Sequence, residues 1–378
     1  MDLSKAFDCL PHELLIAKMH AYGVGKNTLK LIYSYLKGRQ QSVRINGTFS
    51  QWLEILSGVP QGSILGPILF NIFLNDFFYH VQSAEPFNFA DDNNLSSHDK
   101  YLENLIVHLE TAANESIDWL DENKMIANPT KFKGIILKKG MPNTSDISLK
   151  IKDKTIKTKN KVVSLGIKID NKLSYSSHVS ELCKSAAGRL NALKRLKSFL
   201  CPEARKFYVN AYVLSLFNYG SLNWHFSGLV ETHKMEKIQE RAIRFIYDDQ
   251  STDYYELLKK FKLKTLYGKR IRGICSEIYK TKNNLNPSYM KEIFESRPSA
   301  YPTRKPNDIH IPASNYKTFG EKSMRVEGAQ IWNSLPEKIK SATTFEIFKR
   351  EINKIELKTC KCNRNCIDSS NPNVSLLL

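Results

Sequence analysis

The sequence lacks a long hydrophobic run. Its longest apolar stretch, Ile64–Leu74, is interrupted by glycine and proline and is too short to span a bilayer. No basic start leads into an apolar segment of the kind found in secretory signal peptides. We therefore expect an intracellular protein, in the nucleus or the cytoplasm, without a membrane partner.

Acidic residues are also few, because 38 Asp and Glu stand against 56 Lys and Arg and give a net charge of +18. Such an excess favours a polyanionic partner through the release of counterions. Nucleic acid is the first candidate, and an anionic membrane surface is the weaker one. Hydrophobic residues make up 42% of 378 residues, which is enough for two or three folded domains.

Cysteine is scarce and odd in number. Four of the seven cysteines are scattered through segments that we expect to be ordered, as reduced thiols would be: Cys9, Cys183, Cys201 and Cys275. The other three lie close together near the C-terminus: Cys360, Cys362 and Cys366. Because no fourth cysteine or pair of histidines lies nearby, a zinc site would be incomplete, and a free, disordered tail is the favoured interpretation.

The first half of the chain mixes helical and extended patterns. Helices are expected after Pro11 as far as Gly23, then at residues 27–36, 67–78 and 99–123. Asn46-Gly47 indicates a tight hairpin, and residues 132–137 and 161–170 are expected to be strands. Residues 149–162 form either a charged hairpin or a loop. The pattern predicts an α+β fold in which helices pack on one sheet.

The second half is mostly helical. Apolar residues recur at helical spacing at Leu182, Ala186, Leu190, Leu193 and Leu200. Four basic residues lie between them and predict a helix with a basic face: Arg189, Lys194, Arg195 and Lys197. Further helices are expected at residues 202–217, 233–247 and 265–282.

Two adjacent aspartates, Asp91 and Asp92, follow an extended run in which Phe87 and Phe89 alternate with small or polar residues. The pattern predicts a half-buried strand, a turn and a second strand. The aspartates are either part of a solvated turn or ligands of Mg²⁺, which prefers carboxylate oxygens. Two metal ions would need a third carboxylate, for which Asp2 is the candidate, and the chemistry would be that of a polymerase or a nuclease.

Five stretches occur in order between residue 1 and about residue 180: DLSKAFDCLPHELL, GVPQGSILGPILFNIFLNDF, FADDNNL, WLDENKMIANPTKFKGIIL and VSLGIKIDNKLSYSSHV. Together they resemble the palm motifs of reverse transcriptases from non-LTR (LINE-type) retrotransposons, most of all the jockey-like elements. A weaker likeness to the region that follows the palm continues in FNYGSLNWHF, KMEKIQERAIRFIY and AQIWNSLPEKIK.

The resemblance implies a right-hand palm, an antiparallel sheet with packed helices, at residues 1–180. A thumb-like helical region at 181–262, a C-terminal helical region at 263–358 and a tail at 359–378 would follow. It also implies an RNA-directed DNA polymerase that takes an RNA template, a DNA primer and dNTPs, and that adds each nucleotide to the primer 3′-hydroxyl by two-metal transfer.

The resemblance also assigns roles to single residues. Asp2, Asp91 and Asp92 match the carboxylates that hold two Mg²⁺ ions, which Mn²⁺ could replace. Phe7 matches the aromatic gate that excludes a 2′-hydroxyl, and Lys131 matches the lysine near the leaving pyrophosphate. Gln61 and Gly62 match the loop beside the incoming nucleotide, and Leu165 and Gly166 match the primer-grip strand. The basic face would contact the template–primer duplex.

The sequence departs from the family at several places. It begins at the first motif, whereas the family has a fingers region before it, so we expect an N-terminally truncated palm. Phe132 replaces the small hydroxyl residue usual after the lysine, and we expect Asp8 to cap the helix that follows it. An endonuclease would have to come from another element-encoded chain. Two alternatives remain open: a catalytically dead nucleic-acid-binding remnant of a transposable element, and a group II intron maturase.

Overall fold

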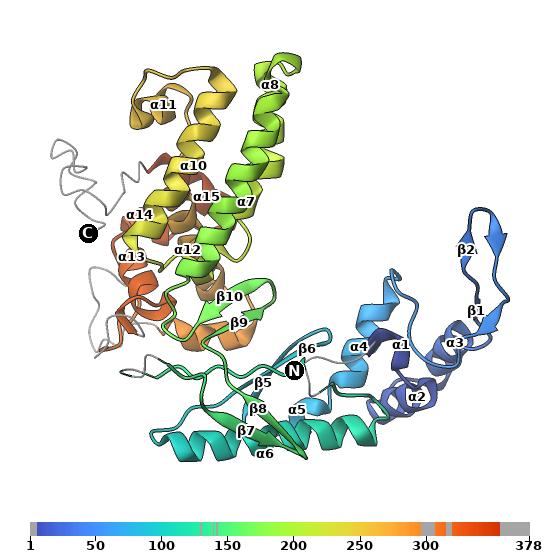
Figure 1. The fold of residues 1–378 in the computed structure, drawn as a ribbon. Coiled ribbons are helices and arrows are strands. Elements are labelled where there is room, and N and C mark those ends of the chain that lie inside the picture. The colour runs from blue at the N-terminus through green and yellow to red at the C-terminus, as the bar shows by residue number, and fades with distance from the viewer. Residues whose placement is uncertain are drawn as a thin grey trace. The chain divides into compact units, whose positions relative to one another are not determined.

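The computed structural model describes residues 6–128, 131–138, 140, 143–295, 307–314 and 320–355. The chain divides into two compact units (Figure 1). Unit 1 comprises Met1–Ile136 and Asn143–Leu165, and unit 2 comprises Leu137–Pro142 and Gly166–Leu378. Asp2 and the three C-terminal cysteines, Cys360, Cys362 and Cys366, lie outside the described residues. The division at residues 180, 262 and 358 stays a prediction.

The helices of unit 1 lie where the sequence predicts them, except for the short first helix, α1, which was not predicted. They are α1 (Ala6–Cys9), α2 (His12–Ala21), α3 (Lys26–Leu36), α4 (Leu65–Leu74), α5 (Phe77–His80) and α6 (Leu102–Glu122). The apolar segment predicted as one helix at residues 67–78 is thus divided, because the chain leaves the helical pattern at Asn75 and Asp76 before α5 begins.

Strands of unit 1 pair as short antiparallel hairpins. β1 (Gln40–Gln41) pairs with β4 (Leu53–Glu54), β2 (Arg44–Ile45) with β3 (Thr48–Phe49), β5 (Glu85–Phe89) with β6 (Asp92–Ser96), and β7 (Ser148–Ile151) with β8 (Lys154–Lys157). β9 (Lys161–Ser164) follows. Asn46 and Gly47 both have positive φ, 49° and 88°, as the predicted tight turn requires.

The prediction of one sheet that carries the helices is not met in the described part of unit 1, where every sheet has two strands. Residues 132–137 are irregular rather than a strand. Phe132 and Ile136 are buried all the same, and Phe132 packs with Ala113 and Ile117. The apolar residues of this segment correctly indicate that it is buried, but an apolar pattern alone does not show whether a segment pairs as a strand.

The core of unit 1 is aromatic and includes one cation. Phe73, Phe77 and Trp119 meet edge to face. The Lys18 ammonium lies 4.4 Å from the centre of the Phe73 ring and 2.6 Å from Asp76 Oδ1. Burial lowers the pKa of Lys18, and the hydrogen bond to Asp76 opposes that shift. This pair ties α2 to the chain between α4 and α5.

Unit 2 begins with β10 (Ile167–Asp170) and is otherwise helical. Its α-helices are α7 (Ser176–Arg195), α8 (Pro202–Tyr208), α9 (Ser221–Trp224), α10 (Leu229–Tyr247), α11 (Tyr254–Lys260), α12 (Leu266–Lys282), α13 (Ala329–Asn333), α14 (Glu337–Lys340) and α15 (Phe345–Lys354). The predicted helix at residues 202–217 changes its hydrogen-bond pattern, since α8 is followed by a π-helical segment (Val209–Val213) and a 3₁₀ segment (Leu214–Phe217). Shorter segments are 3₁₀ at Lys197–Phe199 and Ser288–Ile293 and π-helical at Met324–Gly328.

Two large cores and a smaller one, in which Ile243 of α10 packs with Leu257 and Leu258 of α11, lie within the described part of unit 2. α7 and α10 pack side by side (Figure 1) and bury Ala186, Leu190 and Ala242, as the helical spacing predicts. The other large core lies among α12, α13 and α15, where Tyr279 and Trp332 both stack on Phe348. No helix among the described residues is long and apolar enough to cross a membrane.

Candidate active site

The Asp91–Asp92 pair lies at the turn between β5 and β6, as predicted. Ala90, with φ of 52°, and Asp91 form the turn, and Phe89 pairs with Asp92 across it. Paired residues of an antiparallel ladder point to the same face. Asp92 therefore shares a face with Phe87 and Phe89, and this face is largely exposed, since the two phenylalanines are 56% and 66% exposed.

The opposite face of this hairpin is the covered one. Asn93 is buried, Asn88 is half-buried, and Leu95 packs on the core. The phenylalanines were expected on the buried face, so this expectation is wrong. The alternation tells which residues share a face, but in this hairpin the asparagines and Leu95 face the protein and the aromatic rings face outwards.

The hairpin turn carries two neighbouring carboxylates. Asp91 is half-buried and Asp92 is exposed. Within the described ranges no three His, Cys, Asp or Glu side chains cluster closely enough to hold a metal, and Asp2, the third predicted ligand, lies outside these ranges. Hard carboxylate oxygens that are open to solvent and adjacent in sequence nevertheless fit the donor set that Mg²⁺ prefers.

Further predicted site residues of unit 1 lie on a loop that packs tightly on residues 7–12. Residues 57–62, called here the Gly58 loop, are held by Val59 N donating to Phe7 O at 2.8 Å and Gly58 N donating to Leu10 O at 2.7 Å. Gly58 has a φ of +88°, and a Cβ there would lie 2.7 Å from the Cα of Asp8 and from Phe7 O. Only glycine allows this close approach of two backbones.

Three side-chain hydrogen bonds join the same two segments. Ser57 Oγ donates to Asp8 O at 2.8 Å, and Gln61 Nε2 donates to Asp8 Oδ1 at 2.8 Å. The His12 ring nitrogen Nε2 lies 2.7 Å from Gly58 O, to which it donates. We call these contacts, together with the two backbone bonds, the latch. Sequence reasoning missed Asp8, His12 and Gly58 as site residues; the only signal was their place inside the matched motifs.

The expected capping role of Asp8 is wrong. Pro11 occupies the N-cap of α2, where no side-chain cap bond forms, and Asp8 lies in the separate short helix α1. From there its carboxylate accepts from Gln61. The turn formed by α1 carries the aspartate away from the first N–H groups of α2, which the sequence pattern alone does not reveal.

Two further predicted site residues, Phe7 and Gly62, lie in or next to the segments that the latch joins. The Phe7 ring is half-buried and stacks on Phe70, with 4.5 Å between ring centres. Gly62 has a φ of +80°, yet no atom lies within 4 Å of where its Cβ would be. The backbone conformation therefore requires glycine there, while the space beside it is open.

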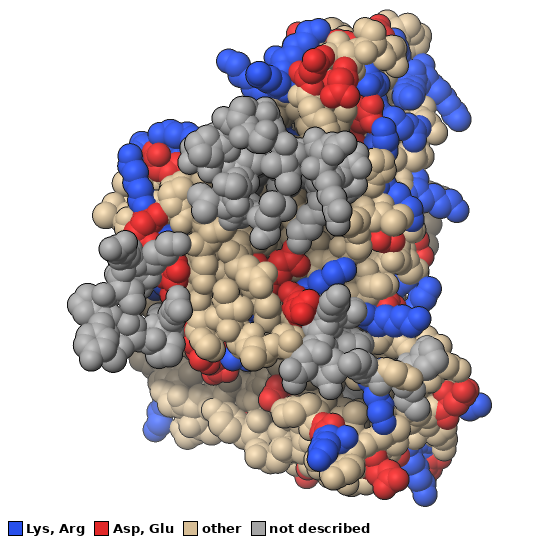
Figure 2. Space-filling view, turned by 90° about the vertical axis from the view of Figure 1, so that its left-hand side faces the viewer, with Lys and Arg blue, Asp and Glu red and all other residues tan. Residues whose placement is uncertain are grey.

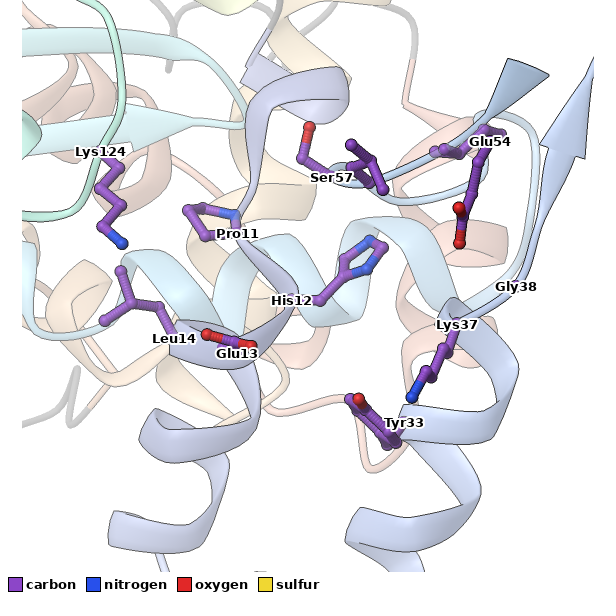
Figure 3. A pocket seen from close by; sticks show the side chains of 12 residues that line it. Pro11, His12, Glu13, Leu14, Tyr33, Lys37, Gly38, Glu54, Ser57 and Lys124 are labelled. Atoms are coloured by element: carbon purple, nitrogen blue, oxygen red, sulfur yellow. The ribbon is translucent and has the colours of Figure 1, made fainter.

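A cavity of about 320 Å³ borders the latch (Figure 3). His12 and Ser57 line it, together with Tyr33 and Lys37 of α3 and Glu54 of β4. Its charged groups are of both signs, so it has no single preference for cations or anions. The cavity leaves one flank of the latch open to solvent.

The remaining predicted residues lie on turns and surfaces. Lys131 is exposed, and its backbone N–H donates to Asn128 O. Leu165 and Gly166 have φ of 46° and 76° and form the turn after β9, so they do not lie in a strand as expected. Within unit 1, Ser164 Oγ lies 3.4 Å from Asn94 Oδ1, which brings the end of β9 beside the Asp91–Asp92 hairpin.

The four predicted basic residues of unit 2 divide into two pairs. Arg189 donates to Tyr212 O at 2.9 Å and its guanidinium lies 4.7 Å from the centre of that ring. Lys197 pairs with Asp248, and their hydrogen bond holds the pKa of Asp248 below its usual value. Lys194 and Arg195 are exposed in the last turn of α7.

Charge on unit 2 is mixed rather than uniform. In Figure 2, Lys and Arg side chains stand out at the upper end, where Figure 1 places α8 and α11, and Asp and Glu lie among them. Exposed aromatic side chains occur beside α8 as well, since Phe199 and Phe207 are 82% and 68% exposed. Basic and aromatic groups together can contact a nucleic acid through phosphates and bases.

Comparisons with known proteins agree with the motifs. Residues 1–169 match the family of reverse transcriptase (RNA-dependent DNA polymerase). The chain is 28% identical over 268 residues to the probable RNA-directed DNA polymerase from transposon BS of Drosophila melanogaster. The matched region covers 66% of this chain and 28% of that protein.

Two other Drosophila melanogaster proteins are similar. The RNA-directed DNA polymerase from mobile element jockey is 25% identical, over 48% of this chain and 20% of its own length. The probable RNA-directed DNA polymerase from transposon X-element is 24% identical, over 65% of this chain and 28% of its own length. The chain thus spans less than a third of these relatives. Residues 1–169 are thus similar to the reverse transcriptase family, and the chain is similar to the RNA-directed DNA polymerases of jockey-like non-LTR retrotransposons.

Proposed function

We propose that this chain is the palm and thumb part of an RNA-directed DNA polymerase, which extends a DNA primer with dNTPs along an RNA template. The observation that carries the proposal is the β5–β6 hairpin, which presents Asp91 and Asp92 at its turn, beside an exposed face. The family match of residues 1–169 gives this turn its expected chemistry.

Asp2, Asp91 and Asp92 would hold two Mg²⁺ ions. Bound there, the ions would activate the primer 3′-hydroxyl and stabilise the leaving pyrophosphate. Other residues would have positioning tasks. Phe7, braced from behind by Phe70, would limit the space at the sugar 2′-position, and Gln61 would contact the incoming nucleotide. The exposed Lys131 would supply positive charge or a proton to the leaving group.

Unit 2 would hold the template–primer duplex. Lys194 and Arg195 are exposed and suited to phosphate contacts, whereas Arg189 and Lys197 are already engaged with Tyr212 and Asp248. Contacts of this kind depend on charge and shape and carry little sequence information. Leu165 and Gly166 would contact the primer from the turn after β9.

The test is primer extension by the full chain on poly(rA) with an oligo(dT) primer, Mg²⁺ and dTTP. The proposal predicts extension that is abolished in Asp91→Asn/Asp92→Asn. Glu85→Gln is the matched control, because Glu85 is an exposed carboxylate at the far end of β5, and it should extend normally. Equal extension by the unchanged chain and the double variant would refute the assignment of the two aspartates.

A second candidate is a nucleic-acid-binding protein without catalysis. The exposed Lys194 and Arg195 and the aromatic rings beside α8 favour it, because they need no metal site to bind a hybrid. Salt-sensitive binding of the RNA–DNA hybrid, with no extension under any metal condition, would select this function over polymerisation.

A further inference from the structure

Asp8 and Gln61 meet in a way that decides how the glutamine amide is turned. Gln61 Nε2 lies 2.8 Å from Asp8 Oδ1. An ionised carboxylate can only accept hydrogen bonds, so the amide must turn its NH₂ group towards Asp8. The other end of the amide, the acceptor Oε1, then points away from Asp8. An aspartate at position 8 thus removes the alternative orientation that an isolated glutamine would have.

The other contacts of the latch hold the two segments that carry this pair. Gly58 approaches α1 so closely that its Cβ would clash with backbone atoms, and both Ser57 Oγ and Gly58 N donate to backbone oxygens of residues 8 and 10. The His12 ring nitrogen Nε2 donates to the carbonyl oxygen of Gly58 and holds the loop as well. The loop that carries Gln61 is therefore fixed to the helix that carries Asp8 by contacts that do not involve Gln61 itself.

We propose that Asp8 is a positioning residue for nucleotide binding: it holds the Gln61 amide so that Oε1 faces the incoming dNTP as a hydrogen-bond acceptor. This inference rests on the proposed function, since it takes the Gly58 loop to border the nucleotide. Asp8 itself accepts from Gln61 and acts on the nucleotide only through it. The sugar 3′-hydroxyl of an incoming dNTP is a donor that such an acceptor can bind.

The experiment measures equilibrium binding of a fluorescent dTTP analogue to the full chain on poly(rA) with a dideoxy-terminated oligo(dT) primer, which cannot be extended. Asp8→Ala should weaken binding about fivefold, the scale of one exposed hydrogen bond. The affinity of Asp8→Asn should lie between those of the unchanged chain and Asp8→Ala. Asparagine keeps an acceptor for the Gln61 amide, but its own NH₂ group also permits the reversed orientation of that amide. The exposed Asp118→Ala, on α6, is the control and should bind as the unchanged chain does.

The decisive comparison is a double-variant cycle with Gln61→Ala. If Asp8 acts through Gln61, Asp8→Ala has no further effect once Gln61 is alanine. Additive losses, or no loss in Asp8→Ala, would overturn the proposal. On an extendable primer, kcat at saturating dTTP should change less than the affinity does.

The same measurements distinguish failure of the proposed polymerase function from failure of the role proposed for Asp8. If the unchanged chain binds the nucleotide but does not extend a primer, polymerisation is refuted while the cycle still decides the role of Asp8. If the unchanged chain binds no nucleotide at all, both the polymerase function and the role of Asp8 in nucleotide binding are refuted.

Discussion

Gly58→Ala should destabilise unit 1 strongly, because two separate penalties meet at this residue. Its φ of +88° is unfavourable for alanine by roughly 1–2 kcal/mol. The added methyl would also lie 2.7 Å from backbone atoms of Phe7 and Asp8, which cannot rotate out of the way. Overpacking of this kind costs roughly 1–3 kcal/mol. We expect a loss of about 3 kcal/mol, a large part of the stability of a typical domain.

Gly62→Ala is the matched control. Gly62 has nearly the same φ, +80°, but no atom lies within 4 Å of where the added methyl would lie, so only the backbone penalty applies. Hydrogen exchange at increasing urea, followed by mass spectrometry, reads the stability of unit 1 separately from that of unit 2. We expect the loss at Gly58 to exceed the loss at Gly62 by about 2 kcal/mol. Equal losses at the two glycines would refute the close approach of the Gly58 loop to α1.

Two further predictions concern unit 2. Lys340→Met leaves the buried carboxylate of Asp308 without its cation and should lower the free energy of urea unfolding by about 3–5 kcal/mol. The double variant Lys340→Met/Asp308→Leu should recover most of this lost stability, because no unpaired charge stays buried. Equal losses in the single and the double variant would contradict the prediction. Burial lowers the pKa of His178, so the unfolded state binds its proton more readily and stability falls as pH drops below about 6.5. His178→Gln should make the fall between about pH 7 and pH 5 shallower, and an unchanged slope would count against this residue.

Much of the fold could be predicted from periodicity. The longer helices of both units follow from apolar spacing, since Ala186 and Leu190 are buried on α7 as expected, whereas the short helices α1, α9, α11, α13 and α14 and the last helix α15 were not predicted. The hairpin at Asn46-Gly47 follows from turn chemistry that this pair satisfies well, since both residues take a positive φ. Sheet formation was harder, because strand pairing depends on partners distant in sequence. Residues 132–137 show this, being apolar and partly buried without pairing as a strand.

The site divides in the same way. The hairpin turn at Asp91 and Asp92 could be predicted from the local pattern, but which face of the hairpin is covered could not, because alternation is symmetric between the two faces. The latch was missed for another reason. Asp8 and Gln61 are 53 residues apart, and nothing in either segment indicates that the two touch. Contacts of this kind come from tertiary packing and require coordinates.

The most direct test of the central claim is metal binding at the hairpin turn. Mn²⁺, which can replace Mg²⁺ and is seen by electron paramagnetic resonance, would be titrated into the full chain with hybrid and dTTP bound on a dideoxy-terminated primer. The account predicts tightly bound Mn²⁺ that is lost in Asp91→Asn/Asp92→Asn and kept in Glu85→Gln. Equal Mn²⁺ binding by the unchanged chain and the double variant would contradict it.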